Sequence, residues 1–249
     1  MKIVHHKDPY YSLAYDFYTE DELAKIWQEL ARLNQQSVLT SNPEATSGAY
    51  EDKLFIMNDA RGATQKKYLK LNYGKFLDDL YAGDRKQSAI LTFNQKILID
   101  EPDYKRQMTN GDNPFSHYLF HINYYATLLN YYEQNHYYAP HIDSSCLTAI
   151  SYFWKEPKLF DGGDLSFPDF PDHHFELKNN CVIVFPSFQK HAVSQVNLKD
   201  GVPTGELNGR FAISQFLSHN FVPKKPHPAE PAVAPSFLDK VGINLTPKS

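Results

Sequence analysis

The sequence predicts a mainly β fold of the α+β class, with helices first and strands after them. A capped amphipathic helix is expected over residues 20–34. From about residue 118 to about residue 218, short apolar or alternating runs are separated by Gly, Pro, Asp and Asn, which is the pattern of strands and turns. Roughly eight such strands in a hundred residues are typical of a jelly roll. The earlier helices are expected to pack on the outside of one of its sheets.

The best-defined element of the N-terminal part is the helix at 20–34. Thr19 and Glu22 fit a capping box, in which each side chain accepts a hydrogen bond from a free backbone N–H group. Residues at helical spacing give the helix one apolar face, formed by Leu23, Ile26, Trp27, Leu30 and Leu33. The remaining N-terminal segments are expected to be a polar loop over 35–63 with a short strand near Leu54–Ile56, a helix around Gly74–Tyr81, and either helix or strand over 86–99.

The strand-rich part follows Pro114. Its runs are rich in β-branched and aromatic residues and are bounded by turn formers. The expected strands are Tyr118–Tyr132, Tyr138–Ile142, Leu147–Trp154, Asp164–Phe167, His174–Leu177, Cys181–Phe185, Ala192–Val196 and Arg210–Leu217. The chain is therefore expected to be a single domain, with 1–115 as a helical support region, 116–220 as the β core and 221–249 as a proline-rich tail.

The composition argues against several classes of function. A net charge of −4 and a pI near 6.2, with scattered Lys and Arg, give no reason to expect a nucleic acid or an anionic membrane as partner. We expect neither a signal peptide nor a membrane span, since no run approaches ~18 apolar residues; the cytoplasm is the default location, and the oligomeric state is left open. Cys146 and Cys181 stand in apolar runs and are expected to be reduced, buried core thiols.

The chemistry is predicted by His141 and Asp143. Residues i and i+2 of a strand point to the same face, so this imidazole and this carboxylate project together. His191, near the start of a later strand, is the candidate third ligand. Two histidines and one carboxylate on one side of an iron form the facial triad of non-haem Fe(II) oxygenases, which leaves coordination positions open. Zinc accepts the same ligands, so the triad alone does not name the metal.

Arg210 opens the last expected strand. A guanidinium grips a carboxylate with two hydrogen bonds and stays charged when buried. An arginine on a core strand after the distal histidine is suited to hold the far carboxylate of 2-oxoglutarate, which a hydrolytic zinc site does not need. The combination therefore favours an oxygenase over a hydrolase.

The region from about Ala126 to Leu217 resembles the prolyl-4-hydroxylase-type family of 2-oxoglutarate/Fe(II)-dependent dioxygenases. The resemblance covers somewhat over a third of the chain and consists of five pieces in the same order. They are Tyr132 to Asp143, against Tyr-x-x-Gly-x-x-Tyr-x-x-His-x-Asp; the strand Leu147–Phe153; Gly162-Gly163-Asp164-Leu165; Phe185-Pro186-Ser187 with His191-Ala192-Val193; and Arg210-Phe211-Ala212-Ile213. Two departures are Asn135 in place of the family's glycine and a longer gap before Arg210, which we assign to a hairpin loop over 197–209.

The resemblance implies a double-stranded β-helix and a set of roles. His141, Asp143 and His191 would bind Fe(II), and Arg210 and Tyr152 would bind the C5 carboxylate of 2-oxoglutarate. Tyr132 would lie near the end of the co-substrate closest to the iron, and Leu165 would contact its methylene groups. The implied reaction uses O2 to convert 2-oxoglutarate to succinate and CO2 while a C–H bond is hydroxylated; ascorbate is an optional further cofactor.

The motif does not name the substrate. A peptidyl prolyl residue is the first expectation, and a free amino acid or another small metabolite is the alternative. Loops 35–63, 102–116 and 197–209 are the candidate lids. Two rivals from other classes are a non-catalytic, cupin-like binding protein and a zinc hydrolase. The remaining histidines, among them His136 and the pair His173-His174, are expected to be solvated turn residues, although His136 is close enough to the mouth to touch substrate.

Overall fold

The computed structural model describes residues 2–36, 70–71, 73–82, 84–97, 107–109, 114–174 and 177–219. The chain divides into two units, Met1–His219 and Asn220–Ser249, and the second lies wholly outside the described residues. The same holds for the expected strand near Leu54–Ile56, most of the loop over 35–63, and the proline-rich tail. The division of the chain into a single domain with three regions stays a prediction.

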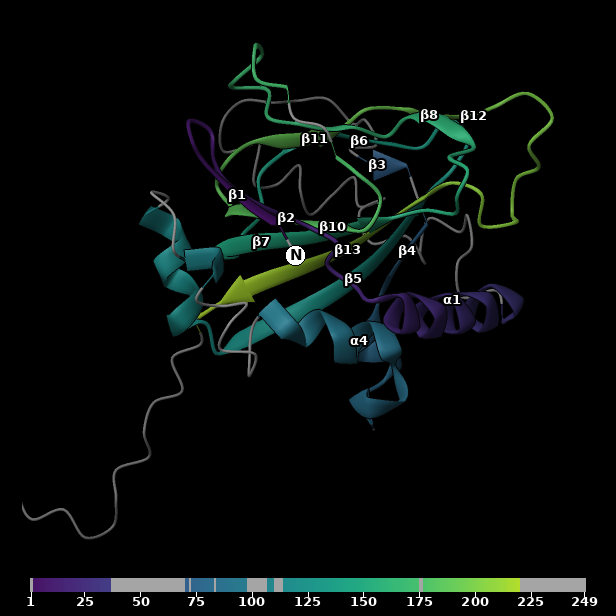
Figure 1. The fold of residues 1–249 in the computed structure, drawn as a ribbon, viewed down its shortest axis with the longest axis horizontal. Helices are drawn as coiled ribbons and strands as arrows, with labels where there is room; N and C mark the ends of the chain where they lie inside the picture. Colours follow the sequence, from purple (N-terminus) through teal and green to yellow (C-terminus); the bar gives the residue numbers. More distant parts are fainter. Residues whose placement is uncertain are drawn as a thin grey trace, which may run out of the picture. The chain divides into compact units, whose positions relative to one another are not determined.

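A seven-stranded antiparallel sheet forms the centre of the first unit (Figure 1). Its strand order is β1-β2-β10-β7-β13-β5-β4. Strands β13 and β5 are paired over their full length: Arg210 lies opposite Tyr132 at one end, and Ser218 lies opposite Tyr124 at the other. The strands are β1 (Lys2–Lys7), β2 (Tyr10–Tyr15), β10 (Cys181–Pro186), β7 (Leu147–Phe153), β13 (Arg210–Ser218), β5 (Tyr124–Tyr132) and β4 (Tyr73–Phe76).

A smaller sheet lies over one face of the large one, as Figure 1 shows for β3, β6 and β11. Its order is β3-β6-β11-β9, and a two-stranded sheet pairs β12 with β8. The bounds are β3 (Lys70–Leu71), β6 (Tyr137–His141), β11 (His191–Val193), β9 (Leu165–Ser166), β12 (Val196–Leu198) and β8 (Phe160–Gly162). The mainly β fold with a double-stranded β-helix core is thereby confirmed.

Alternation along the central strands creates two cores. Successive side chains of a strand point to opposite faces, and in β13 this sends Phe211 and Ile213 to one side and Ala212 to the other. The first core lies under the helices, and the second lies between the sheets around Tyr152 and Phe185. The cavity of the candidate site is lined in part by residues of this second core.

The helices cover the other face of the large sheet (Figure 1). Helix α1 (Glu20–Gln35) begins with the expected capping box: Glu22 N–H donates to Thr19 Oγ1 at 3.3 Å, and Thr19 N–H donates to the Glu22 carboxylate at 2.8 Å. Its apolar face buries Ile26, Leu30 and Leu33. None of the helices within the described ranges is long and apolar enough to cross a membrane.

The segment 86–99, which the sequence left open, is helical as far as it is described. It contains η1 (Arg85–Gln87), α4 (Ala89–Asn94) and η2 (Gln95–Ile97). Ser88 caps α4, because its hydroxyl accepts a hydrogen bond from Leu91 N–H at 3.0 Å. Ile90 and Leu91 are fully buried in the core under the large sheet, so tertiary packing decides between two local readings of the same apolar run.

Several expected boundaries are wrong. Gly74–Phe76 belongs to strand β4, which pairs with β5, and only Leu77–Leu80 is helix (α3). Residues 118–121 belong to the 3₁₀ helix η3 (Pro114–His121), which starts with a proline, as helices tolerate. The expected strand Asp164–Phe167 shrinks to Leu165–Ser166, and His174 and Leu177 are not in a strand.

Among the described strands, β1, β2, β3 and β8 went unpredicted, as did most of β12. The hairpin of β1 and β2 joins the large sheet through the pairing of β2 with β10, and β8 pairs with β12.

The cysteine prediction is right for Cys181, which is buried, and wrong for Cys146, which is exposed. Cys146 lies in the turn before β7, outside the sheet's interior.

Candidate metal centre

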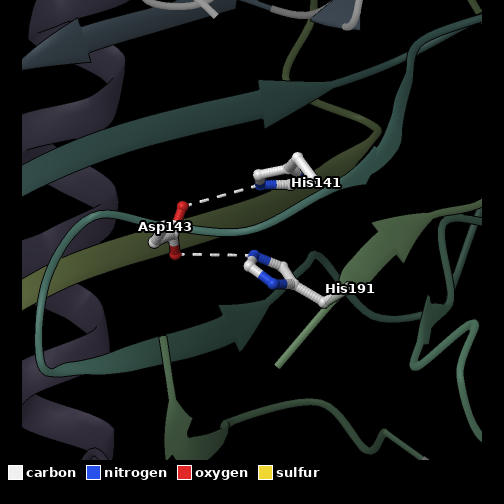
Figure 2. Close-up of side chains that lie close together, drawn as sticks. All are labelled: His141, Asp143 and His191. Atoms are coloured by element: carbon white, nitrogen blue, oxygen red, sulfur yellow. Dashed lines mark ion pairs between the residues drawn. The ribbon is translucent and has the colours of Figure 1, made fainter. Parts of the chain in front are cut away.

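Two neighbouring strands of the small sheet bring His141, Asp143 and His191 together. His141 is the last residue of β6 and His191 the first of β11, and the antiparallel register places the two opposite each other. Asp143 lies two residues beyond His141, in the turn that leads to β7. Figure 2 shows the three side chains converging from these elements.

The ligand atoms of the three side chains all lie within 4.8 Å of one another. His141 Nε2 is 3.6 Å from Asp143 Oδ1, and His191 Nε2 is 3.5 Å from Asp143 Oδ2 (Figure 2). The side chains are only 4–10% exposed. Within the described parts of the chain, no other group of three His, Cys, Asp or Glu residues meets in this way.

The tautomer of both histidines follows from their hydrogen bonds. His141 Nδ1 lies 2.9 Å from the Ala139 carbonyl oxygen, and His191 Nδ1 lies 3.0 Å from the Gln189 carbonyl oxygen. A carbonyl can only accept, so each Nδ1 carries the proton. In the neutral rings the lone pair is then on Nε2, the atom that faces Asp143, which is the usual arrangement of a metal-binding histidine. The donor set fits a divalent first-row metal such as Fe(II).

A cavity extends from the triad between the two sheets. It has apolar walls interrupted by a few polar groups, which is typical of a small-molecule site. Its lining consists of Leu128, Asn130, Tyr132, Tyr138, His141, Asp143, Ile150, Tyr152, His191, Val193, Arg210, Ala212, Ser214 and Phe216. Of the residues with a predicted role, Leu165 alone is missing from this lining: it is on β9, 4% exposed, in the core between the sheets.

Arg210 is the main charged group in the cavity wall. It is 1% exposed, and neither of its two terminal guanidinium nitrogens has a hydrogen-bond partner. Its guanidinium carbon lies 4.3 Å from the Tyr152 ring centre and 5.2 Å from that of Tyr132. No acidic side chain of the described residues forms a salt bridge with it. Burying a cation without a counter-charge is costly, so this position fits a bound anion.

The two tyrosines beside Arg210 are held neutral. Burial raises the pKa of Tyr152, and the nearby Arg210 guanidinium opposes this only in part. Burial likewise raises the pKa of Tyr132; Arg210 lowers that pKa, whereas Asp143 raises it. Tyr152 makes no hydrogen bond of ordinary geometry through its hydroxyl, so its O–H is available to a ligand. Tyr132 lines the same cavity and interacts electrostatically with both Arg210 and Asp143.

Gly163 lets the Arg210 side chain pass. Its φ is +72°, and a Cβ there would lie 3.0 Å from Arg210 Cδ and 2.9 Å from a methyl carbon of Val196. The position therefore excludes larger residues both by backbone conformation and by space. Gly163 therefore leaves room for the Arg210 side chain beside the cavity.

Three of the polar lining residues, Asn130, Tyr138 and Ser214, were given no role by the sequence. The ring of Tyr138 stacks on that of His141, with centroids 3.6 Å apart at an angle of 20°. Asn130 of β5 and Ser214 of β13 are diagonal neighbours on adjacent strands, and Asn130 Nδ2 donates to Ser214 Oγ at 3.2 Å. The sequence did contain a signal for the last two. Asn130 stands two residues before Tyr132 and Ser214 four residues after Arg210, and even spacing places side chains on the same face of a strand.

The other expected histidine positions differ from the metal centre. His136 is not a solvated turn residue but is 7% exposed, with Nδ1 accepting from Glu133 N–H at 3.2 Å, and burial lowers its pKa. It does not line the cavity. His173 packs against His6 and lies 3.1 Å through Nε2 from the Tyr11 hydroxyl.

The loop after β12 leads into β13, whose first residue is Arg210. Residues 199–209 contain neither helix nor strand, as expected of the long hairpin loop. Gly205 N–H donates to the Glu133 carboxylate at 2.8 Å, and the Gly205 carbonyl accepts from Asn34 Nδ2 at 3.1 Å. Neither Asn34 nor Glu133 lines the cavity. The role of the 197–209 loop as a lid stays a prediction.

Comparison with known proteins gives one family match. Residues 126–218 match the family model described as the 2OG-Fe(II) oxygenase superfamily, the same stretch in which the five sequence pieces lie. The match confirms the resemblance to 2-oxoglutarate/Fe(II) oxygenases, the prediction of an oxygenase enzyme, and the cofactors Fe(II) and 2-oxoglutarate. No curated protein sequence matches the chain.

The chain is also similar to solved structures at low sequence identity. A prolyl-4-hydroxylase from Pseudomonas putida has a TM-score of 0.45 at 14% identity, covering 85% of this chain and 93% of the other. The viral collagen prolyl hydroxylase of Paramecium Bursaria Chlorella virus-1, in complex with 2-oxoglutarate, has 0.43 at 13%, covering 83% and 94%. A 2OG-Fe(II) oxygenase family oxidoreductase from Burkholderia pseudomallei has 0.46 at 15%, covering 84% and 86%.

Proposed function

We propose that this chain, an oxygenase of the 2OG-Fe(II) superfamily over residues 126–218, binds Fe(II) through His141, Asp143 and His191 and hydroxylates a peptidyl prolyl residue. One observation carries the proposal. A buried arginine whose two terminal nitrogens lack partners opens into the same cavity as a converging His-Asp-His group. A dicarboxylate co-substrate such as 2-oxoglutarate would fit both features, because its 2-oxo acid end chelates a metal and its other carboxylate can pair with the guanidinium.

In this proposal Arg210 binds the C5 carboxylate of 2-oxoglutarate with its two free nitrogens, a geometry that guanidinium and carboxylate share. The Tyr152 hydroxyl donates a hydrogen bond to the same carboxylate, since the raised pKa of Tyr152 keeps the hydroxyl protonated. Tyr132 bounds the co-substrate on the side of the triad. In place of the expected Leu165, Ile150 and Val193 of the cavity lining are the better candidates to contact its methylene groups.

The remaining residues orient the substrate and exclude water. When bound, the iron supplies the oxidative chemistry, in which 2-oxoglutarate, O2 and a C–H bond yield succinate, CO2 and a hydroxyl group. The apolar side chains of Leu128, Ile150 and Phe216 keep the cavity dry. Tyr138, stacked on His141, fixes the plane of that imidazole ring. The protein thus provides position and environment.

The choice of a peptidyl prolyl residue rests on the ordered motif of Tyr132–Asp143 and the later strands, which resembles prolyl-4-hydroxylases. A free amino acid or small metabolite is the alternative within the same chemistry. Substrate grooves are built from loops, and two candidate lids, 35–63 and 102–116, lie largely outside the described residues. The substrate must therefore be found by assay.

The first experiment adds Fe(II) and then 2-oxoglutarate to the metal-free protein without oxygen, and records the visible charge-transfer band of a chelated 2-oxo acid. The proposal predicts a band in the wild type and none in His141→Ala. Succinate release on adding O2 is then compared across proline-containing peptides and free amino acids. Peptide-dependent release supports the prolyl proposal, and release with amino acids alone replaces it with the metabolite alternative.

Absence of the band would contradict the ligand assignment. Wild-type protein that binds iron or zinc without the band would be explained by a cupin-like binding protein or a zinc hydrolase. These two rivals separate in turn by whether the zinc-loaded protein hydrolyses ester or amide substrates.

A further inference from the structure

We infer that Thr148 and Ser187 are positioning residues for the metal, acting through Asp143 by a one-way chain of hydroxyl hydrogen bonds. The inference rests on the proposed function, in which Asp143 is a ligand. Neither hydroxyl belongs to the triad and neither residue lines the cavity. Both residues are fully buried.

The chain of contacts starts at the carboxylate. Thr148 Oγ1 lies 2.6 Å from Asp143 Oδ2, a short contact typical of a hydroxyl that donates to a charged oxygen. Ser187 Oγ lies 2.8 Å from Thr148 Oγ1. Ser145 Oγ lies 2.7 Å from Ser187 Oγ. Three hydroxyl groups in a row therefore stand behind one oxygen of the metal-facing carboxylate.

The chemistry of the carboxylate sets the direction of this chain. An ionised carboxylate only accepts hydrogen bonds, so Thr148 must donate its single hydroxyl proton to Asp143. Thr148 Oγ1 is then an acceptor for Ser187, and Ser187 Oγ is an acceptor for Ser145. Ser145 also lies 3.2 Å from the Leu147 carbonyl oxygen, an alternative acceptor, so its link is the weakest. Hydrogen bonds in such a row polarise one another, which strengthens the grip on Asp143.

The backbone of Ser187 adds a second restraint. Asp143 lies beyond the end of β6, so no strand ladder holds it; instead its N–H donates to the Ser187 carbonyl at 2.9 Å. Ser187 N–H in turn donates to the Cys146 carbonyl at 3.3 Å. Ser187 follows β10 and stands four residues before His191. One residue therefore ties the turn that carries Asp143 to the segment that carries the distal histidine.

A buried hydroxyl cluster could also serve the fold alone, and the test must separate the two roles. Co(II), a spectroscopic substitute for Fe(II), is titrated into metal-free protein without 2-oxoglutarate, and affinity and visible bands are recorded. Thr148→Val removes the hydroxyl and nearly keeps the shape, whereas Thr148→Ser keeps the hydroxyl. Thr127→Val is the matched control: Thr127 is fully buried on β5, which β13 separates from β7 in the same sheet, and its hydroxyl has no partner.

The expected result is a loss of Co(II) affinity of about 10–100-fold in Thr148→Val, the usual effect of removing a group that orients a ligand. The Co(II) bands should shift in the same variant. Thr148→Ser should bind close to wild type, and Thr127→Val should not change affinity or bands. Unchanged affinity and bands in Thr148→Val would overturn the inference, and so would equal losses in the Val and Ser variants.

A double-mutant cycle tests whether Ser187 acts through Thr148. Ser187→Ala keeps the backbone bond to Asp143 and removes only the hydroxyl. It should weaken Co(II) binding by less than Thr148→Val, and in the Thr148→Val background it should weaken binding no further. Full additivity would overturn the role of Ser187 in the chain.

Asp143→Ala distinguishes failure of this inference from failure of the proposed function. If the wild type binds Co(II) and Asp143→Ala does not, the ligand assignment stands, and the Thr148 variants alone decide the inference. If Asp143→Ala binds Co(II) as the wild type does, Asp143 is not a ligand, and both proposals fall.

Discussion

Glu29 and Arg210 are two buried charged residues on opposite sides of the large sheet, and their surroundings differ. On the helix side, the Glu29 carboxylate accepts hydrogen bonds from the Tyr81 hydroxyl at 2.7 Å, the Ser88 hydroxyl at 2.8 Å and Ile90 N–H at 3.0 Å. On the cavity side, the two terminal nitrogens of Arg210 have no partner.

The contrast separates a charge that stabilises the fold from a charge that, in our proposal, binds the co-substrate. Glu29 satisfies the start of α4 and is itself satisfied. A buried charge without a partner is costly, and the proposed carboxylate ligand would offset that cost at Arg210. Gln215 and Thr127 also lack partners at buried side-chain atoms, but both are neutral, so the cost there is smaller.

The largest expected effect is that of His141→Ala. Removal of a residue that merely orients a metal ligand weakens metal binding by up to ~100-fold. Loss of one of the three ligands should weaken Fe(II) binding by more than that, and turnover should cease. The free energy of unfolding of the metal-free protein should change little. Anaerobic Fe(II) titration and urea unfolding measure the two quantities, and a variant that retains wild-type iron affinity would contradict the ligand assignment.

Arg210→Ala should weaken 2-oxoglutarate binding by ~2–4 kcal/mol, the cost of breaking a buried charged pair. The metal-free, ligand-free variant should be as stable as wild type or more stable, because an unpaired buried charge is removed. Calorimetry with 2-oxoglutarate and urea unfolding test this pair of results. Strong destabilisation with unchanged co-substrate affinity would make Arg210 a structural residue like Glu29.

Glu29→Ala should show the opposite pair. It leaves buried donors of Tyr81, Ser88 and Ile90 unpaired, at ~1–3 kcal/mol for each one that water cannot reach, so the free energy of unfolding should fall by at least ~2 kcal/mol. The affinity of the folded protein for 2-oxoglutarate should not change. A loss of affinity comparable to that of Arg210→Ala would show that the two sides are not independent.

Tyr152→Phe should have a smaller effect than Arg210→Ala. It removes one hydrogen bond to a charged carboxylate, worth ~1.5 kcal/mol or somewhat more, and leaves the ring against the guanidinium. Its partner in the test is Leu165→Ala, which should lower stability through lost core packing and leave 2-oxoglutarate affinity unchanged, because Leu165 does not line the cavity. Calorimetry on both variants checks the contrast, and equal affinity losses would place Leu165 at the co-substrate.

The smallest effect concerns His136, a buried ionisable group that remains neutral. Burial lowers its pKa in the folded state, so near and below its ordinary value of ~6.5 the unfolded chain binds a proton that the folded chain resists. Its contribution to stability is therefore present above pH ~6.5 and is lost as the pH falls through the lowered pKa of the folded state. Thermal unfolding from pH 5 to 8 should show a shallower acid decline for His136→Gln than for wild type; identical declines would contradict this.

The sequence predicted those features that local rules determine. The capping box of Thr19 and Glu22 defines α1 by itself. The i, i+2 spacing correctly predicted that His141 and Asp143 lie close together, although Asp143 is in the turn after β6 and not in a strand. The central strands β7, β10 and β13 are continuous β-rich runs, and their boundaries agree with the structure within a residue. Matching pieces along Ala126–Leu217 supplied the third ligand and the arginine.

The features it missed depend on tertiary neighbours. Gly74–Phe76 and residues 118–121 carry apolar patterns that fit helix or strand, and pairing with β5 or packing of Leu119 decides between them. Leu165 was placed in the right strand, where it lies opposite Val193 of β11, and its role at the co-substrate stays a prediction. The contact of Thr148 with Asp143 requires the turn between β6 and β7 to fold back, which no spacing rule reveals.

The central claim is that Arg210 binds the C5 carboxylate of 2-oxoglutarate in the same cavity that holds the metal. The most direct test compares 2-oxoglutarate with 2-oxobutanoate, a 2-oxo acid without that carboxylate, by the charge-transfer band of anaerobic Fe(II)-loaded wild type and Arg210→Ala. The account predicts that wild type prefers 2-oxoglutarate by ~30-fold or more, as ~2–4 kcal/mol implies, and that the preference disappears in Arg210→Ala. A preference that survives in the variant would contradict the claim.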